Sequence, residues 1–208
     1  MSKQSRTSVN LPTVLCAFAL ALFAWSGVGP YDRVTWALEV APVAIGVIVL
    51  LFTYNRYPLT RLVYWLLFIH ACILMIGGHY SYARVPVGYW VQDLFDLQRN
   101  PYDRLGHFAQ GFIPAMLIRE MLLRTSPLKV GKWLFVLVTC SCLAFSAFYE
   151  LIEWWAALAL EQGAEEFLGT QGDQWDTQWD MFMALVGAIT AQLFLSNQHQ
   201  TQLKVLLK

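Results

Sequence analysis

The sequence predicts an all-α fold, an integral membrane bundle of six transmembrane helices that forms one domain over residues 1–208. Hydrophobic residues make up 57% of the chain and charged residues only 13%, whereas soluble domains carry about 25% charged residues. Apolar runs of about 18 residues recur along the chain, which is the length that a helix needs to satisfy its backbone inside lipid. The net charge of +0 gives no reason to expect a nucleic-acid partner.

The first three helices are expected over residues 11–28, 34–52 and 62–80. Pro12 suits the first turn of the first helix, and Gly27 and Pro30 end it. This stretch is longer than the apolar region of a signal peptide and lacks a cleavage motif, so we expect an uncleaved span. Pro42 predicts a kink in the second helix. A loop rich in aromatic and turn residues follows the third helix.

The last three helices are expected over residues 103–123, 133–160 and 179–195. The fourth helix starts near Asp103 and contains Pro114. The fifth exceeds the roughly 20 residues that cross a bilayer, so it is tilted or projects from the membrane. A second loop covers residues 161–178, and the tail over residues 197–208 is expected to be either an amphipathic end or disordered.

Charged residues divide unequally between the two sides of the predicted bundle. Of the 14 Asp and Glu residues, only Glu120 falls on the side of the termini. The basic residues predict that both termini are cytoplasmic, while no insertion rule requires the acids to lie outside, so we interpret the acids as an outward-facing polar site. Ten of the 14 Lys and Arg residues fall on the inner side: Lys3, Arg6, Arg56, Arg61, Arg119, Arg124, Lys129, Lys132, Lys204 and Lys208.

Asp103 and His107 form the first of three polar groups on the outer side. Their i,i+4 spacing places both on one helix face, one turn apart. A carboxylate and an imidazole in this arrangement can chelate a divalent metal, or act as an acid/base pair in which the aspartate orients the imidazole. The alternative is an aspartate that caps the helix beside an interfacial histidine.

Glu150 and Glu153 form the second group, with an i,i+3 spacing that again places both on one face. The two carboxylates repel each other unless a cation lies between them. Glu150 follows Trp133 by about 17 residues, or roughly 26 Å of helix, which places it at or inside the edge of the hydrocarbon. The alternative is a pair of solvated carboxylates at the outer surface.

Asp173, Asp176 and Asp180 form the third group, with spacings of i, i+3 and i+7. If the last helix begins early, they make one acidic stripe that enters the membrane. Their spacing differs from the Ca²⁺ loop of an EF-hand, which needs its glycine and distal glutamate in register. The alternative is an acidic outer loop with aspartates that cap the helix.

The three groups lie at the outer ends of the last three predicted helices, so packing of the bundle would bring them together. Several acids in a low dielectric need a compensating cation, which Arg104 or a divalent metal could supply. Oxygen ligands with one histidine suit Mg²⁺, Mn²⁺, Ca²⁺, Zn²⁺ or non-haem iron. The candidate metal ligands are Asp103, His107, Glu150, Glu153, Asp176 and Asp180, and the candidate catalytic residues among them are Asp103, His107 and Glu150.

Three further polar residues, on the second and third predicted helices, are secondary candidates. Glu39 and His79 fall on the outer side and could support the site from a second layer. His70 falls near the middle of the membrane, where a lone histidine is more often hydrogen-bonded to a neighbouring helix than bound to a metal.

Three segments resemble the YjdF family of bacterial inner membrane proteins. They are residues 102–108 (YDRLGHF), 149–154 (YELIEW) and 167–181 (FLGTQGDQWDTQWDM). The resemblance covers the whole chain and implies a multi-pass inner membrane protein, without implying a reaction. A remoter similarity is to VanZ-like membrane proteins: D-K-x-x-H-F fits with Arg104 in place of Lys, and a later D-x-x-x-N-x-x-G fits with Ala184 in place of Asn.

Three classes of function stay open. The first is a metal-dependent or acid/base enzyme that acts on a lipid head group or a lipid-linked envelope substrate at the outer leaflet. The second is a cation- or proton-coupled transporter with His70 and Glu39 along its path. The third is a structural or regulatory protein whose acidic face binds a partner. Because the inner halves of the last three helices are nearly all apolar, the sequence favours a site on one side.

The division of charge predicts the result of a topology experiment. Reporter fusions after Gln98 and after Gly169 should read as periplasmic, because the basic residues hold the termini in the cytoplasm. Paired reporters that are active on only one side of the membrane measure this. A cytoplasmic reading after Gly169 would place the acids on the wrong side and contradict an outward-facing site.

Overall fold

The computed structural model describes residues 11–160 and 170–208, and all of its regular structure in these ranges is helical. The expectation of an all-α fold is therefore confirmed. The elements are α1 (Leu11–Ser26), α2 (Arg33–Thr53), α3 (Arg61–Tyr80), the 3₁₀ helix η1 (Tyr82–Arg84), α4 (Pro86–Phe95), α5 (Tyr102–Thr125), α6 (Lys132–Leu160) and α8 (Asp176–Leu206).

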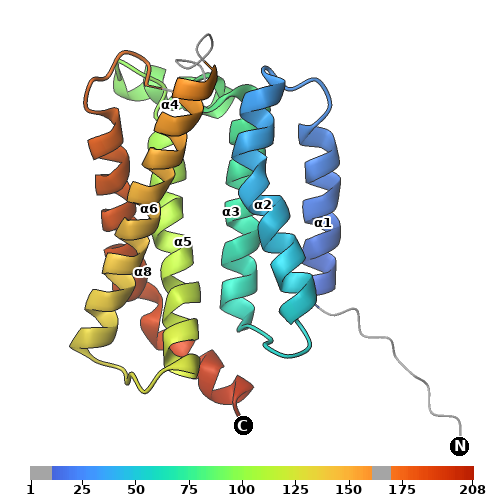
Figure 1. Ribbon diagram of the computed structural model, residues 1–208, viewed down its shortest axis with the longest axis vertical. Helices are drawn as coiled ribbons and strands as arrows, with labels where there is room; N and C mark the ends of the chain where they lie inside the picture. The colour runs from blue at the N-terminus through green and yellow to red at the C-terminus, as the bar shows by residue number, and fades with distance from the viewer. Residues whose placement is uncertain (1–10, 161–169) are drawn as a thin grey trace, which may run out of the picture.

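The long helices run side by side in two groups (Figure 1). The first group is α1, α2 and α3, in which α3 packs against both others, and the second is α5, α6 and α8. The two groups meet where α3 packs against α5. Buried apolar residues of α3, α5, α6 and α8 form the main core, including Val63, Met116, Val138 and Ala188. A short helix, α4, lies across one end of the second group (Figure 1).

Four of the described helices, α2, α3, α6 and α8, are long and apolar enough to cross a membrane. α1 is apolar but has only 16 residues. α5 has 24 residues but a lower hydropathy, because it carries charged residues at both ends, among them Asp103 and Glu120. These two side chains are buried against other helices. The structure thus supports a helical membrane protein with several apolar helices, while the number of six spans stays a prediction.

Two expectations about the boundaries are corrected. The loop after α3 is partly ordered as η1 and α4 rather than irregular throughout. The last helix does not end near residue 195, because α8 continues to Leu206. The prediction that residues 197–208 form a separate amphipathic end or a disordered tail is therefore wrong.

A buried polar cluster explains why α8 stays ordered beyond the core. The carboxylate of Glu120 is fully buried and accepts hydrogen bonds from the Thr60 hydroxyl at 2.8 Å, from Arg124 at 2.8 Å and from His199 Nε2 at 3.0 Å. Arg119 lies 2.6 Å from His199 Nδ1. A guanidinium can only donate, so Nδ1 accepts and Nε2 carries the proton. The sequence suggested that the inner halves of the last three helices are nearly all apolar. This cluster shows that they are not.

Close contact between backbones sets the register of α5 against α8. A Cβ atom at Gly111 would collide with the backbone of Ala184, and one at Gly187 would collide with the carbonyl oxygen of Phe108. Small residues let helices approach closely in a membrane, where packing rather than hydrophobicity drives association. This pair of helices makes the most extensive helix–helix contact in the described part of the molecule.

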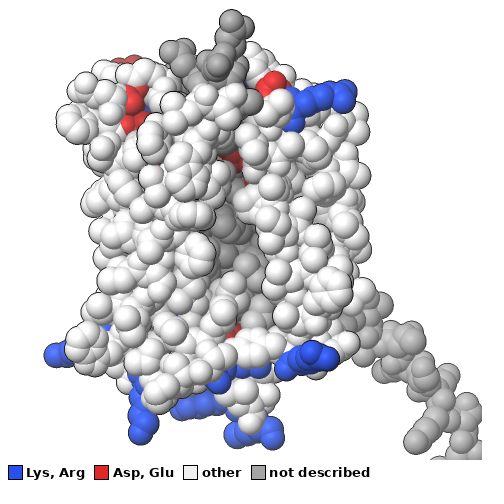
Figure 2. All heavy atoms as spheres, viewed as in Figure 1, with Lys and Arg blue, Asp and Glu red and all other residues white. Residues whose placement is uncertain are grey.

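The two ends of the bundle differ in charge. Figure 2 shows most of the Lys and Arg residues at the end where the C-terminus lies, and acidic side chains toward the opposite end. We call these the basic end and the acidic end. At the acidic end, Asp32 caps α2, with Oδ1 accepting a hydrogen bond from Thr35 N at 2.7 Å. This backbone hydrogen bond lowers the pKa of Asp32.

Replacing Gly187 by alanine tests the contact between α5 and α8. The added methyl group would push the two backbones apart, and overpacking of this kind costs about 1–3 kcal/mol. Gly46→Ala is the matched control, because a Cβ there meets nothing within 4 Å. The apparent melting temperature in detergent should fall for Gly187→Ala and stay level or rise for Gly46→Ala. Equal melting temperatures for the two variants would contradict the close contact.

Candidate functional site

Buried carboxylates gather at the acidic end of the bundle, on α2, α5, α6 and α8. Each of them is at most 8% exposed to solvent. Burying this much negative charge is costly unless cations or protons compensate it. The six residues are Glu39, Asp103, Glu150, Glu153, Asp176 and Asp180.

Arg99 connects α5 to α8 across this end. Its Nη2 lies 3.1 Å from Asp103 Oδ2, and its Nη1 forms an ion pair with Asp176. The sequence pointed to Arg104 as the cationic partner and missed Arg99, which precedes α5 in the chain. The i,i+4 spacing between Arg99 and Asp103 was the signal that could have revealed it.

Arg104 makes the second set of bridges between the same helices. Its Nη1 lies 3.1 Å from Asp180 Oδ1, and its Nη2 lies 2.8 Å from Asp173 Oδ2. The guanidinium also lies over the ring of Trp179, at 5.6 Å from its centroid. The expectation that Arg104 neutralises part of the acidic group agrees with this geometry.

Two loop residues fix the approach of α5 and α8 to each other. Asn100 and Gln171 exchange two hydrogen bonds, Asn100 N to Gln171 Oε1 at 3.0 Å and Gln171 Nε2 to Asn100 O at 3.1 Å. Asn100 Oδ1 also accepts from Tyr102 N at 3.0 Å, which satisfies a backbone donor at the start of α5. Gln171 has a φ of 48° and Gly172 a φ of 83°, so the chain turns sharply before α8.

His107 lies at the centre of the group. Its Nε2 is 3.6 Å from Asp103 Oδ1 and 3.8 Å from Asp180 Oδ2, which is too long for hydrogen bonds. Each aspartate binds an arginine with one oxygen and turns the other toward the imidazole. The three ligand atoms lie within 4.8 Å of one another. Ligands at about 2 Å from a divalent metal lie roughly 3–3.5 Å apart, so a small contraction would complete three coordination positions.

The other nitrogen of His107 faces α6 and its own helix. Nδ1 lies 3.2 Å from Gln110 Oε1 and 3.7 Å from Glu150 Oε1. Glu150 is only 8% exposed, and within the described ranges its Oε1 has no hydrogen-bond partner. A buried carboxylate oxygen without a partner is costly, and such atoms often face a ligand or a proton.

The remaining candidates occupy different places. Asp176 is held by Arg99 and Arg104 and is not among the three atoms that converge. Glu153 is buried on α6 and faces the cavity described below. The described contacts of His79 are with α1 and its own helix rather than with these carboxylates: its Nδ1 lies 2.9 Å from the carbonyl oxygen of Ser26, and its ring packs against Trp25 and Tyr80.

His70 also departs from expectation. Its Nε2 is buried and has no hydrogen-bond partner in the described part of the chain, so the predicted hydrogen bond to a neighbouring helix is not formed through this atom. The ring lines the same cavity as Glu153.

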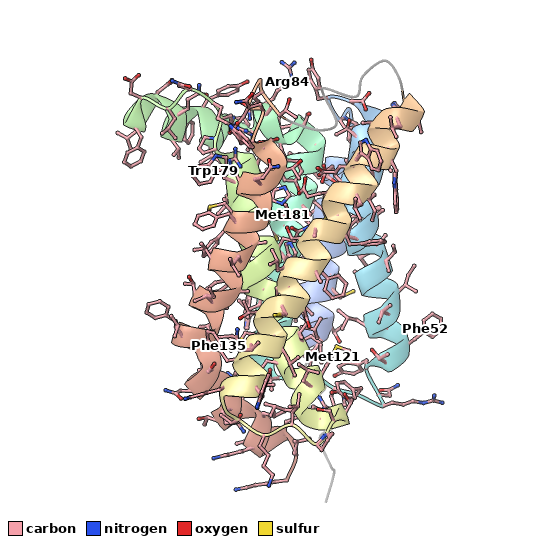
Figure 3. The ribbon with its side chains drawn as sticks, turned by 60° about the vertical axis from the view of Figure 1, so that its left-hand side comes forward. Phe52, Arg84, Met121, Phe135, Trp179 and Met181 are labelled. Atoms are coloured by element: carbon pink, nitrogen blue, oxygen red, sulfur yellow. The ribbon has the colours of Figure 1, made fainter. Side chains whose placement is uncertain are left out.

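A cavity of about 600 Å³ runs from this site into the apolar interior between the two groups of helices. Its acidic end is lined by Glu39, Asp103, His107, Tyr149 and Glu153. The rest is mostly apolar, and it is lined among others by Leu74, Leu117, Ile118, Met121, Leu122, Phe145 and Phe148. Figure 3 shows Met121 toward the basic end of the bundle, well away from Met181.

The cavity forms a groove between α2 and α6 on the surface of the bundle. α2 packs on α3, whereas α6 packs on α5 and α8, so the two helices belong to separate groups. Figure 2 shows the surface hollowed along this line, with acidic atoms visible inside toward the acidic end. There the Tyr149 hydroxyl donates a hydrogen bond to Glu39 Oε2 at 3.1 Å and joins α6 to α2.

Comparison with known proteins shows the family of the chain. The model of the family described as "Predicted membrane protein (DUF2238)" matches residues 11–201. The chain belongs to this family. It is also 55% identical over 196 residues to the inner membrane protein YjdF of Escherichia coli (strain K12), which covers 93% of this chain and 94% of that protein. No solved structure matches the chain.

The comparisons confirm the resemblance to the YjdF family and support an inner membrane protein with several apolar helices. Neither family description names a reaction, a ligand or a partner. The remoter similarity to VanZ-like proteins stays a prediction, as do the metal-binding and catalytic roles of the six candidate residues.

Proposed function

We propose that the protein is a metal-dependent enzyme of the inner membrane that acts on the head group of a lipid or a lipid-linked envelope substrate. In this proposal six helices cross the bilayer and both termini are cytoplasmic, so the acidic end faces the periplasm. The basic residues at the opposite end support this orientation.

The observation that carries the proposal is the convergence of three ligand atoms on α5 and α8. Asp103 Oδ1, Asp180 Oδ2 and His107 Nε2 face one another at spacings too long for hydrogen bonds and close to those of metal ligands. The charge balance supports a cation, because Arg99 and Arg104 pair with Asp103, Asp176 and Asp180, whereas Glu39, Glu150 and Glu153 have no arginine partner in the described part of the chain.

The arrangement gives each residue a distinct role. The metal would polarise an oxygen of the head group as a Lewis acid. A histidine that binds a metal through Nε2 usually donates its Nδ1–H to an oxygen, and Gln110 Oε1 is placed to accept it. Glu150 is close to the same nitrogen and keeps one oxygen without a hydrogen bond, so we assign it the transfer of a proton.

The lining of the groove suits a substrate that is part lipid and part polar. Its acidic end contains Asp103 and His107, and its apolar part continues between the helix groups. Most of its lining toward the basic end is apolar, for example Leu117 and Met121. A transported ion would need polar groups along this stretch. The alternatives of a cation- or proton-coupled transporter and of an acidic face that binds a partner therefore receive less support.

Elemental analysis of the purified protein tests the metal. The wild type should retain about one divalent ion per chain, and His107→Ala and Asp180→Asn should lose it, since each removes one of three ligands. Asp173→Asn is the matched control. It removes a carboxylate that pairs with the arginines but does not face His107, so the metal should stay.

Two results would contradict this proposal. One is a wild-type protein that holds no metal after incubation with Mg²⁺, Mn²⁺, Zn²⁺ or Fe²⁺. The other is an Asp180→Asn variant that inserts into the membrane and keeps the same metal content as Asp173→Asn.

A further inference from the structure

We propose that the acidic end of the groove binds the ammonium group of an amine-bearing lipid between Glu39 and Glu153, with one hydrocarbon chain of that lipid lying along the groove. This inference deepens the proposed function by naming the class of substrate. It rests on the proposed function only in assuming that the bound lipid is the substrate of a reaction. Binding itself does not depend on that function, because the residues that hold the ammonium group are not the metal ligands.

Glu153 is the first observation. Its side chain is 7% exposed and lines the groove. Within residues 11–160 and 170–208 it forms neither a hydrogen bond nor an ion pair, although it shares a face of α6 with Glu150 and lines the groove together with Glu39. A buried carboxylate beside like charges needs either a proton or a cation. A ligand in the groove can supply that cation.

Glu39 faces the same end of the groove from α2. It is 5% exposed, and its Oε2 accepts the hydrogen bond of the Tyr149 hydroxyl at 3.1 Å. The described part of the chain offers it no ion pair, because the arginine bridges at this end involve Asp103, Asp173, Asp176 and Asp180. The carboxylates that line the groove from α2 and α6 are thus left without a basic partner.

The geometry around Tyr149 fits a primary ammonium group. Such a group offers three donors, and the two carboxylates with the hydroxyl oxygen of Tyr149 offer three acceptors. Tyr82 lines the same end and adds an aromatic ring, which attracts a cation. A hydrated metal ion is less suited to this place, because the aromatic rings and the apolar side chains beside them cannot hydrogen-bond to its water.

The length of the groove fits a hydrocarbon chain. Its lining on α5 extends from Asp103 to Thr125, which is about 33 Å at the helical rise and comparable to the roughly 30 Å of the hydrocarbon core. About 600 Å³ over that length leaves a narrow passage, wide enough for one chain. The groove lies between α2 and α6 on the surface of the bundle, so a lipid can enter sideways from the bilayer.

A lipid head group that carries an amine is also compatible with the metal site proposed above. A zwitterionic head group carries a phosphate next to its ammonium. With the ammonium between Glu39 and Glu153, the phosphate would face the group of Asp103, His107 and Asp180, where a divalent cation balances its charge. The two sites would then bind the two halves of one head group.

Native mass spectrometry with two defined lipids tests the inference. Detergent-purified protein is titrated with phosphatidylethanolamine and with phosphatidylglycerol of the same acyl chains. The wild type should prefer phosphatidylethanolamine by about tenfold, the ratio expected of one favourable charge interaction. Glu153→Gln, which keeps the shape of the side chain, should bind both lipids equally. Asp96→Asn is the control, because Asp96 is an exposed acid at the end of α4 and its removal should leave the preference unchanged.

The outcomes separate this inference from the proposed function. Asp180→Asn and chelator-treated wild type should lose the metal yet keep most of the preference for the amine lipid. Equal binding of the two lipids by the wild type would overturn the inference, as would a preference that survives in Glu153→Gln. Continued binding of phosphatidylglycerol by Glu153→Gln shows that the variant is folded.

Discussion

The contact between α5 and α8 is the constraint on which the rest of the structure depends. Gly111 and Gly187 let the two backbones touch, and this fixes which side chains meet above and below the contact. Toward the acidic end it places Asp103 and His107 beside Asp180, and toward the basic end it places Glu120 beside His199. One packing interaction therefore aligns two polar clusters at opposite ends of the bundle.

The two clusters differ in how their charge is balanced. At the basic end, Glu120 has a hydrogen-bond donor for each carboxylate oxygen, so that cluster can serve as a structural clamp. At the acidic end, Arg99 binds one oxygen of Asp103, and Arg104 binds one oxygen of Asp180. The second oxygen of each aspartate is turned toward His107. Glu150 Oε1, which faces the same histidine, is buried without a hydrogen-bond partner in the described part of the chain, and the cost of such an atom is the physical argument for a ligand.

The sequence predicted the helical class, most helix positions and the place of the acidic group, because hydropathy, charge asymmetry and helical spacing are local patterns. It missed Arg99 as a bridge and expected a disordered or amphipathic tail where α8 continues. Both depend on contacts between segments far apart in the chain, such as Arg99 with Asp176 and His199 with Glu120. The groove was also beyond prediction, since it arises from how the two helix groups diverge rather than from any one segment.

The central claim is that a cation holds the acidic cluster together, and the thermal stability of Glu150→Gln in detergent tests it most directly. If a cation is bound beside His107, removing this charge should lower the melting temperature, and a chelator should lower that of the wild type as well. If the carboxylates only repel one another, the same substitution relieves repulsion. A stabilised variant, together with a wild type indifferent to chelator, would contradict the account.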